Sequence, residues 1–128
     1  LPDVLMRFRY YRVAWAAVTE KAFLMVQIKE ADRDVLRFLW INDTDNEDPN
    51  TVVKRFNRVV CGVTSSPFLL NATIRHHMTK YEANDPQFVS DFLPSLSVDD
   101  FTKGKDSISK AIELYRKARS RIKETGFN

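Results

Sequence analysis

The most regular pattern of apolar and polar positions lies near the end of the chain. Its apolar residues recur every three or four positions, and they are Ile108, Ala111, Ile112, Tyr115, Ala118 and Ile122. This spacing predicts an amphipathic helix that is capped by Asp106 or Ser107 and stops at Gly126. The opposite face is cationic, which is typical of a solvated surface and also of a surface that lies along a phosphate backbone. Its residues are Lys110, Arg116, Lys117, Arg119, Arg121 and Lys123.

Shorter patterns before this helix predict alternating strands and helices. An apolar run at 13–19 predicts a central strand covered on both faces, and 37–41 predicts a second strand. A longer helix is expected to start at Pro67 after an N-cap at Ser66. Its buried stripe consists of Leu70, Ile74, Met78 and Tyr81. Further helical segments are predicted at 1–9, 20–28, 31–35 and 88–93.

A polar segment at 42–50 leads to a returning strand at 52–60, in which Lys54, Arg55 and Arg58 bring three cations together. The polar segment carries four carboxylates, Asp43, Asp45, Glu47 and Asp48. A calcium loop of the EF-hand type is excluded, because its sixth and twelfth positions need glycine and glutamate. Those positions are Asp48 and Lys54 here, so a solvated hairpin loop is predicted.

Two adjacent carboxylates, Asp99 and Asp100, stand between a strand at 96–98 and a returning strand at 101–103 that ends at Gly104. Burying two like charges in an apolar run is costly, so the pair is predicted to lie at the tip of a β-hairpin. Such a pair can hold Mg²⁺, which uses one or two carboxylates together with waters and substrate phosphates. The alternative is an ordinary exposed turn, in which Asp-Asp pairs are common.

The predicted order of elements defines an α+β domain, an antiparallel sheet with helices packed on one face. The 128 residues form one domain at most, and 44% hydrophobic residues are enough for a core. The formal net charge of +3 is compatible with a nucleic-acid partner. His76 and His77 would point about 100° apart on a helix, so we expect core-edge or surface histidines and not a metal site.

Cysteine usage and hydropathy bear on the compartment and on contact with a membrane. The single cysteine, Cys61, excludes an intrachain disulfide and favours a reducing, intracellular location, in the cytoplasm or the nucleus. No apolar run approaches the roughly 20 residues of a membrane span, and the start lacks a signal-peptide pattern, so no membrane partner is expected. The start at Leu1 without methionine and the stop after Asn128 are expected to be cuts through a larger protein.

Several separated motifs match one family in order and spacing. They are Glu20-Lys21-Ala22-Phe23-Leu24, Asp32-Arg33-Asp34, Arg37-Phe38-Leu39-Trp40, the block from Gly62 to Ile74, Val98-Asp99-Asp100-Phe101 and Gly126-Phe127-Asn128. Together they cover nearly the whole chain and resemble the palm region of a reverse transcriptase from a Pao/BEL-type LTR retrotransposon. The resemblance implies that residues 1–128 are a palm fragment, with the fingers largely missing and the thumb and RNase H regions absent. The palm faces that those parts would cover are then expected to be exposed and to favour self-association.

The family implies RNA- and DNA-templated DNA synthesis, in which a primer 3′-hydroxyl attacks the α-phosphorus of a deoxynucleoside triphosphate. Its partners are a nucleic-acid template-primer and a dNTP, and its cofactor is a pair of Mg²⁺ ions. By resemblance, Asp99 and Asp100 are the catalytic, metal-binding residues, and Phe23, Gly62 and Val98 are nucleotide-binding positions. Two simpler interpretations stay open: Phe23 as a core anchor of its helix, and Gly62 as an ordinary turn glycine.

The chain departs from the family at Val18, which stands where the third metal-binding carboxylate belongs, two residues before Glu20. Valine offers no oxygen ligand, and removing one member of a catalytic set typically costs several orders of magnitude in rate. This lost ligand position favours a palm that is impaired in catalysis. Ser97 also replaces the tyrosine expected before Val-Asp-Asp, and Val60 and Cys61 replace an expected proline and phenylalanine. The alternatives are a non-catalytic relic that binds nucleic acid or a protein through its basic last helix, and a translated fragment without function.

Overall fold

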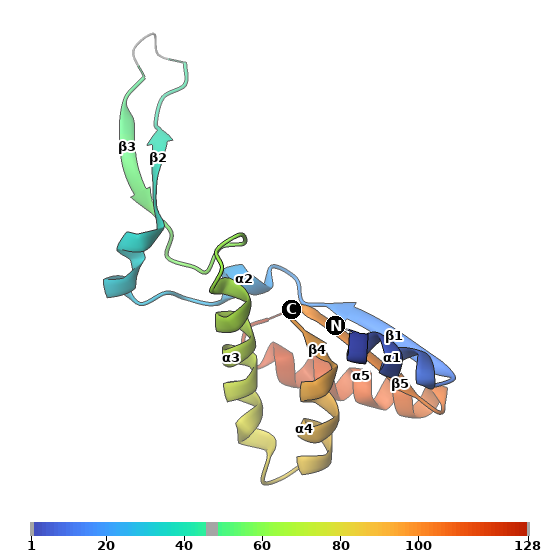
Figure 1. Ribbon diagram of the computed structural model, residues 1–128. Helices are drawn as coiled ribbons and strands as arrows, with labels where there is room; N and C mark the ends of the chain where they lie inside the picture. Colours follow the sequence, from blue (N-terminus) through green and yellow to red (C-terminus); the bar gives the residue numbers. More distant parts are fainter. Residues whose placement is uncertain (1, 46–48, 128) are drawn as a thin grey trace.

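The computed structural model describes residues 2–45 and 49–127 and contains two antiparallel sheets, with helices around the larger one (Figure 1). The larger sheet has the strand order β1-β5-β4, and its strands are β1 (Val13–Val18), β5 (Asp100–Lys105) and β4 (Leu96–Ser97). The smaller sheet pairs β2 (Arg37–Ile41) with β3 (Thr51–Arg55). The predicted α+β class is therefore confirmed.

Helices appear in all the segments predicted to be helical. The α-helices are α1 (Pro2–Tyr10), α2 (Ala22–Met25), α3 (Ser66–Met78), α4 (Pro86–Phe92) and α5 (Ile108–Lys123). Short 3-10 helices are η1 (Glu30–Leu36), η2 (Thr79–Tyr81) and η3 (Leu93–Ser95). Four residues named in the sequence predictions, Leu1, Glu47, Asp48 and Asn128, lie outside the described residues.

The helix predicted at 20–28 is wrong for most of its length, because α2 is only four residues long. Lys21 before it is left-handed at φ 52°, and Val26 after it is already extended. The carbonyl of Val26 accepts a hydrogen bond from the N–H of Val59 at 2.9 Å. Pairing with this distant segment overrides the local helical preference. The same pairing shortens the strand predicted at 52–60. β3 ends at Arg55, and Arg58 forms a bridge with Gln27, just after α2, instead of pairing with β2.

Phe101 on β5 lies at the centre of the core. Its ring is 4.9 Å from the ring of Trp15 on β1 and 4.8 Å from the ring of Phe92 on α4. The Trp15 ring in turn lies 5.3 Å from that of Tyr115 on α5. Helices α4 and α5 therefore cover the face of the sheet that carries Phe101. Helix α3 adds three side chains without exposed surface, Leu70, Ile74 and Met78.

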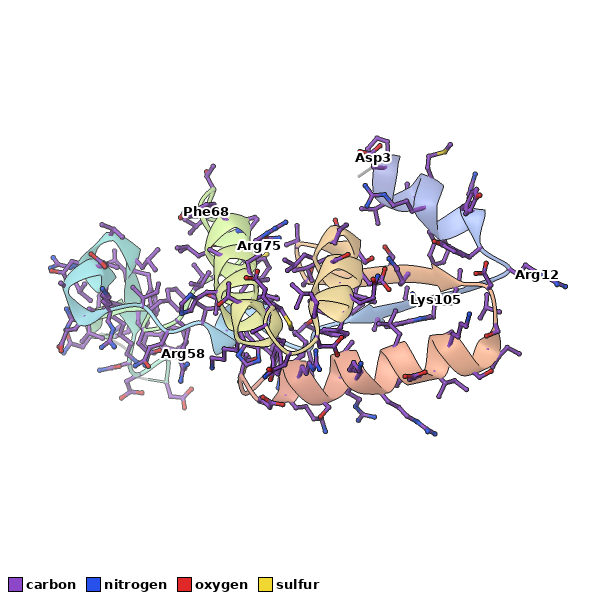
Figure 2. The ribbon with its side chains drawn as sticks, turned by 90° about the horizontal axis from the view of Figure 1, so that it is seen from below. Asp3, Arg12, Arg58, Phe68, Arg75 and Lys105 are labelled. Atoms are coloured by element: carbon purple, nitrogen blue, oxygen red, sulfur yellow. The ribbon has the colours of Figure 1, made fainter. Side chains whose placement is uncertain are left out.

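Helix α1 lies on the opposite face of the larger sheet from α5 (Figure 2). A Cβ atom at Gly104 would lie 2.6 Å from both Cβ and Cδ2 of Tyr11, which follows α1. Only glycine leaves room for Tyr11 against the sheet. Gly104 was expected to end the hairpin, but it lies inside β5, which continues to Lys105.

Among the described strands, β1 lies at the edge of its sheet, so the prediction of a central strand covered on both faces is wrong. Burial alternates along it, with Trp15 half-buried on the core face and Ala14 and Ala16 exposed on the other. Val18 is 68% exposed. The apolar run hides this alternation, because the exposed positions are also occupied by apolar residues.

The apolar stripe of α5 is rotated from the predicted one. Ile108 and Ile112 are 66% and 43% exposed, whereas Leu114, which was not predicted, is 8% exposed. The buried positions of the helix are Ala111, Leu114 and Ala118. The predicted cap is confirmed at Ser107, whose hydroxyl accepts a hydrogen bond from the Lys110 N–H at 3.4 Å.

The β2–β3 hairpin projects away from the rest of the molecule (Figure 1). Leu39 and Val53 on it are 73% and 63% exposed. The cations expected to gather on the returning strand have separate partners. The Nζ atom of Lys54 lies 4.8 Å from the centre of the Trp40 ring, and Arg55 pairs with Asp34 at 3.0 Å. The hairpin therefore presents apolar side chains and not a free cationic cluster.

The two histidines of α3 lie at the core edge and at the surface, as the sequence predicts. His77 is 6% exposed, and its Nε2 lies 2.8 Å from the backbone oxygen of Arg121. His76 is exposed. His77 thus helps to join α3 to the end of α5.

Asp85, the N-cap of α4, joins α4 to α5. Its Oδ2 accepts hydrogen bonds from Lys117 Nζ at 2.7 Å and from Arg121 Nη2 at 2.8 Å, and its Oδ1 accepts one from the Phe88 N–H at 3.2 Å. The Arg121 guanidinium also lies 4.2 Å from the centre of the Tyr81 ring. The pKa of Asp85 lies below its ordinary value, and the hydrogen bond from Lys117 is the largest cause. Desolvation of the carboxylate opposes this shift, and the hydrogen bonds from Phe88 and Arg121 add to it.

Across residues 2–45 and 49–127, no helix has the length and apolar character that crossing a bilayer requires.

Replacing Asp85 with asparagine is expected to lower the free energy of unfolding at pH 7, because Lys117 and Arg121 lose their shared anion. The pKa of Asp85 is lower in the folded chain than in the unfolded chain, so its contribution is complete above the unfolded value of about 4 and is lost as the pH falls through the folded value. Urea unfolding at pH 7 and at about pH 3 should then show a weaker pH dependence for Asp85→Asn than for the wild type. Asp106→Asn, at an exposed acid, is the control. An unchanged pH dependence in Asp85→Asn would contradict this assignment.

Candidate functional site

The hairpin β4–β5 presents the two candidate carboxylates. Its turn residues are Val98 and Asp99, and Asp100 is already the first residue of β5, opposite Ser97. The predicted tip, Asp99-Asp100, is therefore shifted by one residue. Val98 adopts a left-handed conformation at φ 58°, which is rare for a β-branched residue and costs roughly 1–3 kcal/mol. Its side chain packs against the hydrophobic core, and this contact offsets the strain.

The register between β1 and β5 places Val18 directly opposite Asp100. One residue further, the N–H of Thr19 donates to the carbonyl of Asp99 at 2.9 Å. Hydrogen-bonded and non-hydrogen-bonded pairs alternate along an antiparallel ladder, so Val18 and Asp100 form a non-hydrogen-bonded pair. In such a pair the two side chains are at their closest, with Cβ atoms about 4.5–5.5 Å apart.

Thr19 contributes to this site in a way that sequence reasoning missed. Its backbone N–H ties the end of β1 to the turn that carries Asp99. Only the register reveals this contact, since a backbone donor leaves no mark in the residue types.

The two carboxylates are accessible. Asp99 is half-buried and Asp100 is exposed. Among the described residues, neither of them forms an ion pair with a lysine or an arginine. Mg²⁺ is commonly bound through one or two carboxylates while it keeps several waters.

A larger ligand set is not present at the hairpin. Within the described ranges, no group of three or more His, Cys, Asp or Glu residues is placed to hold a metal ion. The position opposite Asp100 is a valine, so the residues present do not match the three-carboxylate set that the resemblance implies for two ions.

Phe23 and Gly62 lie on other elements, near the start of α3. Phe23 on α2 is half-buried and packs against the core, and α2 contacts α3. Gly62 lies in the turn before α3 at φ +93°, and a Cβ atom there would have open space around it. The left-handed backbone alone therefore accounts for glycine at this position.

A small cavity of about 120 Å³ lies beside the end of β1. Val18 and Thr19 line one side of it, and Arg119 and Lys123 of α5 line another. Phe101 and Phe92 are among its apolar lining residues. The sequence placed these two cations on the basic face of the last helix but gave no sign that they border the end of β1.

Comparison with known proteins adds no assignment. A scan against profiles of protein families finds no match, and a search of curated proteins finds none.

Substituting aspartate for Val18 is expected to create a stronger cation site, because a carboxylate would then stand opposite Asp100 and beside Asp99. The affinity for Mn²⁺, measured by electron paramagnetic resonance of the free ion, should rise by at least about tenfold. Val18→Asn, which has the same shape without the charge, is the matched control and should leave the affinity near the wild-type value. If Val18→Asn binds Mn²⁺ as tightly as Val18→Asp, the three carboxylate positions do not converge.

Proposed function

We propose that the chain serves as the palm region of an RNA-directed DNA polymerase of a Pao/BEL-type retrotransposon, and that its catalysis is impaired at Val18. The observation that carries the proposal is the pairing of Val18 with Asp100 next to Asp99. It joins two segments that lie about 80 residues apart and that the sequence resemblance independently assigns to one catalytic site.

The impairment follows from charge. In the family that the chain resembles, two divalent ions stabilise the attacking and leaving oxygens, and carboxylates offset the ionic charge. A valine at position 18 withdraws one ligand and one negative charge from that set. The remaining pair, Asp99 and Asp100, is suited to a single ion with a largely aqueous shell. The proposal therefore assigns these two residues a metal-binding role and implies a lower rate of nucleotide addition.

The other roles follow the same proposal. Phe23 would contact the sugar of an incoming dNTP, and Gly62 would allow the protein backbone to approach the templating base pair closely. Val98 would be a further nucleotide-binding position. Phe23 also packs against the core, and one aromatic side chain can do both. The proposal implies an intracellular location, in the cytoplasm or the nucleus, and no membrane partner.

Primer extension tests the proposal directly. The wild-type chain is expected to extend a primer on an RNA or DNA template weakly or not at all with Mg²⁺ or Mn²⁺. Val18→Asp should raise incorporation by about two orders of magnitude or more, because it restores a missing member of the catalytic set. Val18→Asn is the shape-matched control, and Val18→Asp combined with Asp99→Ala should return incorporation to the background. If Val18→Asp extends no better than Val18→Asn, the missing carboxylate at position 18 does not by itself account for the impairment.

A second candidate function is nucleic-acid binding without chemistry, through the basic face of α5. The ion pairs divide that face in two. Lys117 and Arg121 are held by Asp85, whereas other cations of α5 remain exposed. The exposed ones are Lys110, Arg116, Arg119 and Lys123. Cations without a carboxylate partner are the ones available to phosphates.

Binding through this face predicts a strong dependence on salt. The logarithm of the affinity for duplex should fall linearly with the logarithm of salt concentration, because each phosphate contact releases counterions. Replacing Arg116 and Arg119 with glutamine should lower the magnitude of this slope by about two. Replacing Arg7 and Arg9 of α1 in the same way is the charge-matched control. Equal slopes for the two double variants would exclude α5 as the binding face.

A further inference from the structure

The outer edge of β1 has no neighbouring strand in the part of the chain that the structure describes. The Thr19 N–H donates to the Asp99 carbonyl, so the hydrogen-bonded pairs between β1 and β5 fall at the odd-numbered residues of β1. The N–H and C=O groups of the even-numbered residues therefore point away from β5. These residues are Ala14, Ala16 and Val18.

β1 lacks the features that usually protect an edge strand. Its sequence, Val-Ala-Trp-Ala-Ala-Val, contains no charged residue and no proline. An apolar groove of about 420 Å³ runs beside it, between β1 and the first half of α5. Among the residues that line this groove are Val13, Trp15, Ala16, Ile108, Ile112 and Tyr115. A strand added to β1 would bond to the free backbone groups and also lie next to Ile108 and Ile112, which are 66% and 43% exposed.

We propose that this strand is β1 of a second copy of the chain, paired antiparallel with its centre at Ala16. In that register Ala16 lies opposite Ala16 of the other copy, and Ala14 lies opposite Val18. Every outward N–H and C=O group of the three residues then has a partner. A register centred on Trp15 would place Val18 opposite Arg12, and one centred on Ala17 would place Ala14 opposite Glu20. In both cases the partner residue lies outside β1. The symmetric pairing centred at Ala16 is thus the one in which all the outward backbone groups of β1 form hydrogen bonds to β1 of the other copy.

The charges at the two ends of β1 match the same register. Arg12 directly precedes the strand, Glu20 follows it after Thr19, and both are exposed. Glu20 also lies 3.8 Å from the Lys21 ammonium, at the surface. Figure 2 shows Arg12 extending away from the body of the molecule. In the pairing centred at Ala16, Arg12 of one copy lies opposite Glu20 of the other, and the two-fold symmetry repeats this contact at the far end. Opposite charges at both ends favour a second copy in this register over a one-residue shift.

The assembly closes at two copies. The pairing uses the free edge of β1 in both copies, and a two-fold interface leaves no equivalent edge for a third. The other outer edge of the sheet is β4, which is two residues long. A continuous six-stranded sheet across the two copies is the expected result. This dimer does not depend on the proposed polymerase function, because Asp99 and Asp100 take no part in it and Val18 contributes only its backbone N–H and C=O groups.

Sedimentation equilibrium of the chain over a wide range of concentration should show a monomer–dimer equilibrium. Ala16→Pro removes the central outward N–H, and an edge strand tolerates proline where its N–H faces solvent. This variant should weaken dimerisation by at least about tenfold while keeping a cooperative melt. A chain that is monomeric at all concentrations, one that forms larger assemblies without a dimer, or a folded Ala16→Pro that dimerises like the wild type would overturn the proposal.

Two charge variants keep the test decisive if Ala16→Pro does not fold. Because residue 16 faces itself across the two-fold axis, Ala16→Lys alone and Ala16→Glu alone should each dimerise more weakly than the wild type. An equimolar mixture of the two should form heterodimers, since the opposite charges then face each other. Failure of the mixture to dimerise more than its separate components would overturn the register.

Disulfide cross-linking tests whether the two-fold axis of the dimer lies at Ala16. In a Cys61→Ser background, Ala16→Cys should oxidise to a disulfide-linked dimer, because residues facing each other in a hydrogen-bonded pair have Cα atoms about 5.5 Å apart, within disulfide range. Ala14→Cys is the matched control on the same edge. It faces position 18 of the other copy, so its own two thiols lie about 13 Å apart along the strands and should not link. Equal cross-linking of the two variants would overturn the register centred at Ala16.

Discussion

The antiparallel pairing of β1 with β5 determines the core packing of the larger sheet, the position of the candidate site and the direction of the free strand edge. It places the Trp15 ring against the Phe101 ring, and this contact starts the packing that α4 and α5 complete. It places Val18 opposite Asp100, which defines the candidate site. It also sends the remaining backbone groups of β1 outward, toward the proposed second copy. A slip of one residue would exchange the two faces of β1 and remove all three features at once.

Around this pairing, the core is held by apolar contacts and one ion cluster. Leu70, Ile74 and Met78 of α3 pack with Phe88, Phe92 and Phe101, so α3, α4 and the sheet share a single core. Asp85 then connects the start of α4 to the second half of α5. The β2–β3 hairpin takes no part in this core, and its exposed apolar side chains show that its surface is not needed for the packing of the sheet.

Local patterns in the sequence were reliable where the neighbouring residues decide the structure. The strand at 37–41 was predicted at its observed bounds, and the buried stripe of α3 was correct at Leu70, Ile74 and Met78. The errors arose where distant segments decide. Backbone pairing of Val26 with Val59 ended α2 early, and the edge position of β1 depends on strand order, which an apolar run does not encode. The candidate carboxylates were identifiable as residues, and the resemblance already associated Val18 with them. Only the strand register shows that Val18 stands directly opposite Asp100.

Gly104 has a consequence for how the face with Asp100 can be approached. Because Gly104 has no side chain, Tyr11 packs directly against the sheet. α1 and the turn after it then cover the stretch from Thr102 to Gly104. The other end of the same face, with Val18 and Asp100, stays open to solvent. A ligand that lies along β5 and reaches Asp100 therefore meets α1 and Tyr11 at one end of this face only. The N-terminal helix thus closes one end of this face, and it can pack there because residue 104 has no side chain.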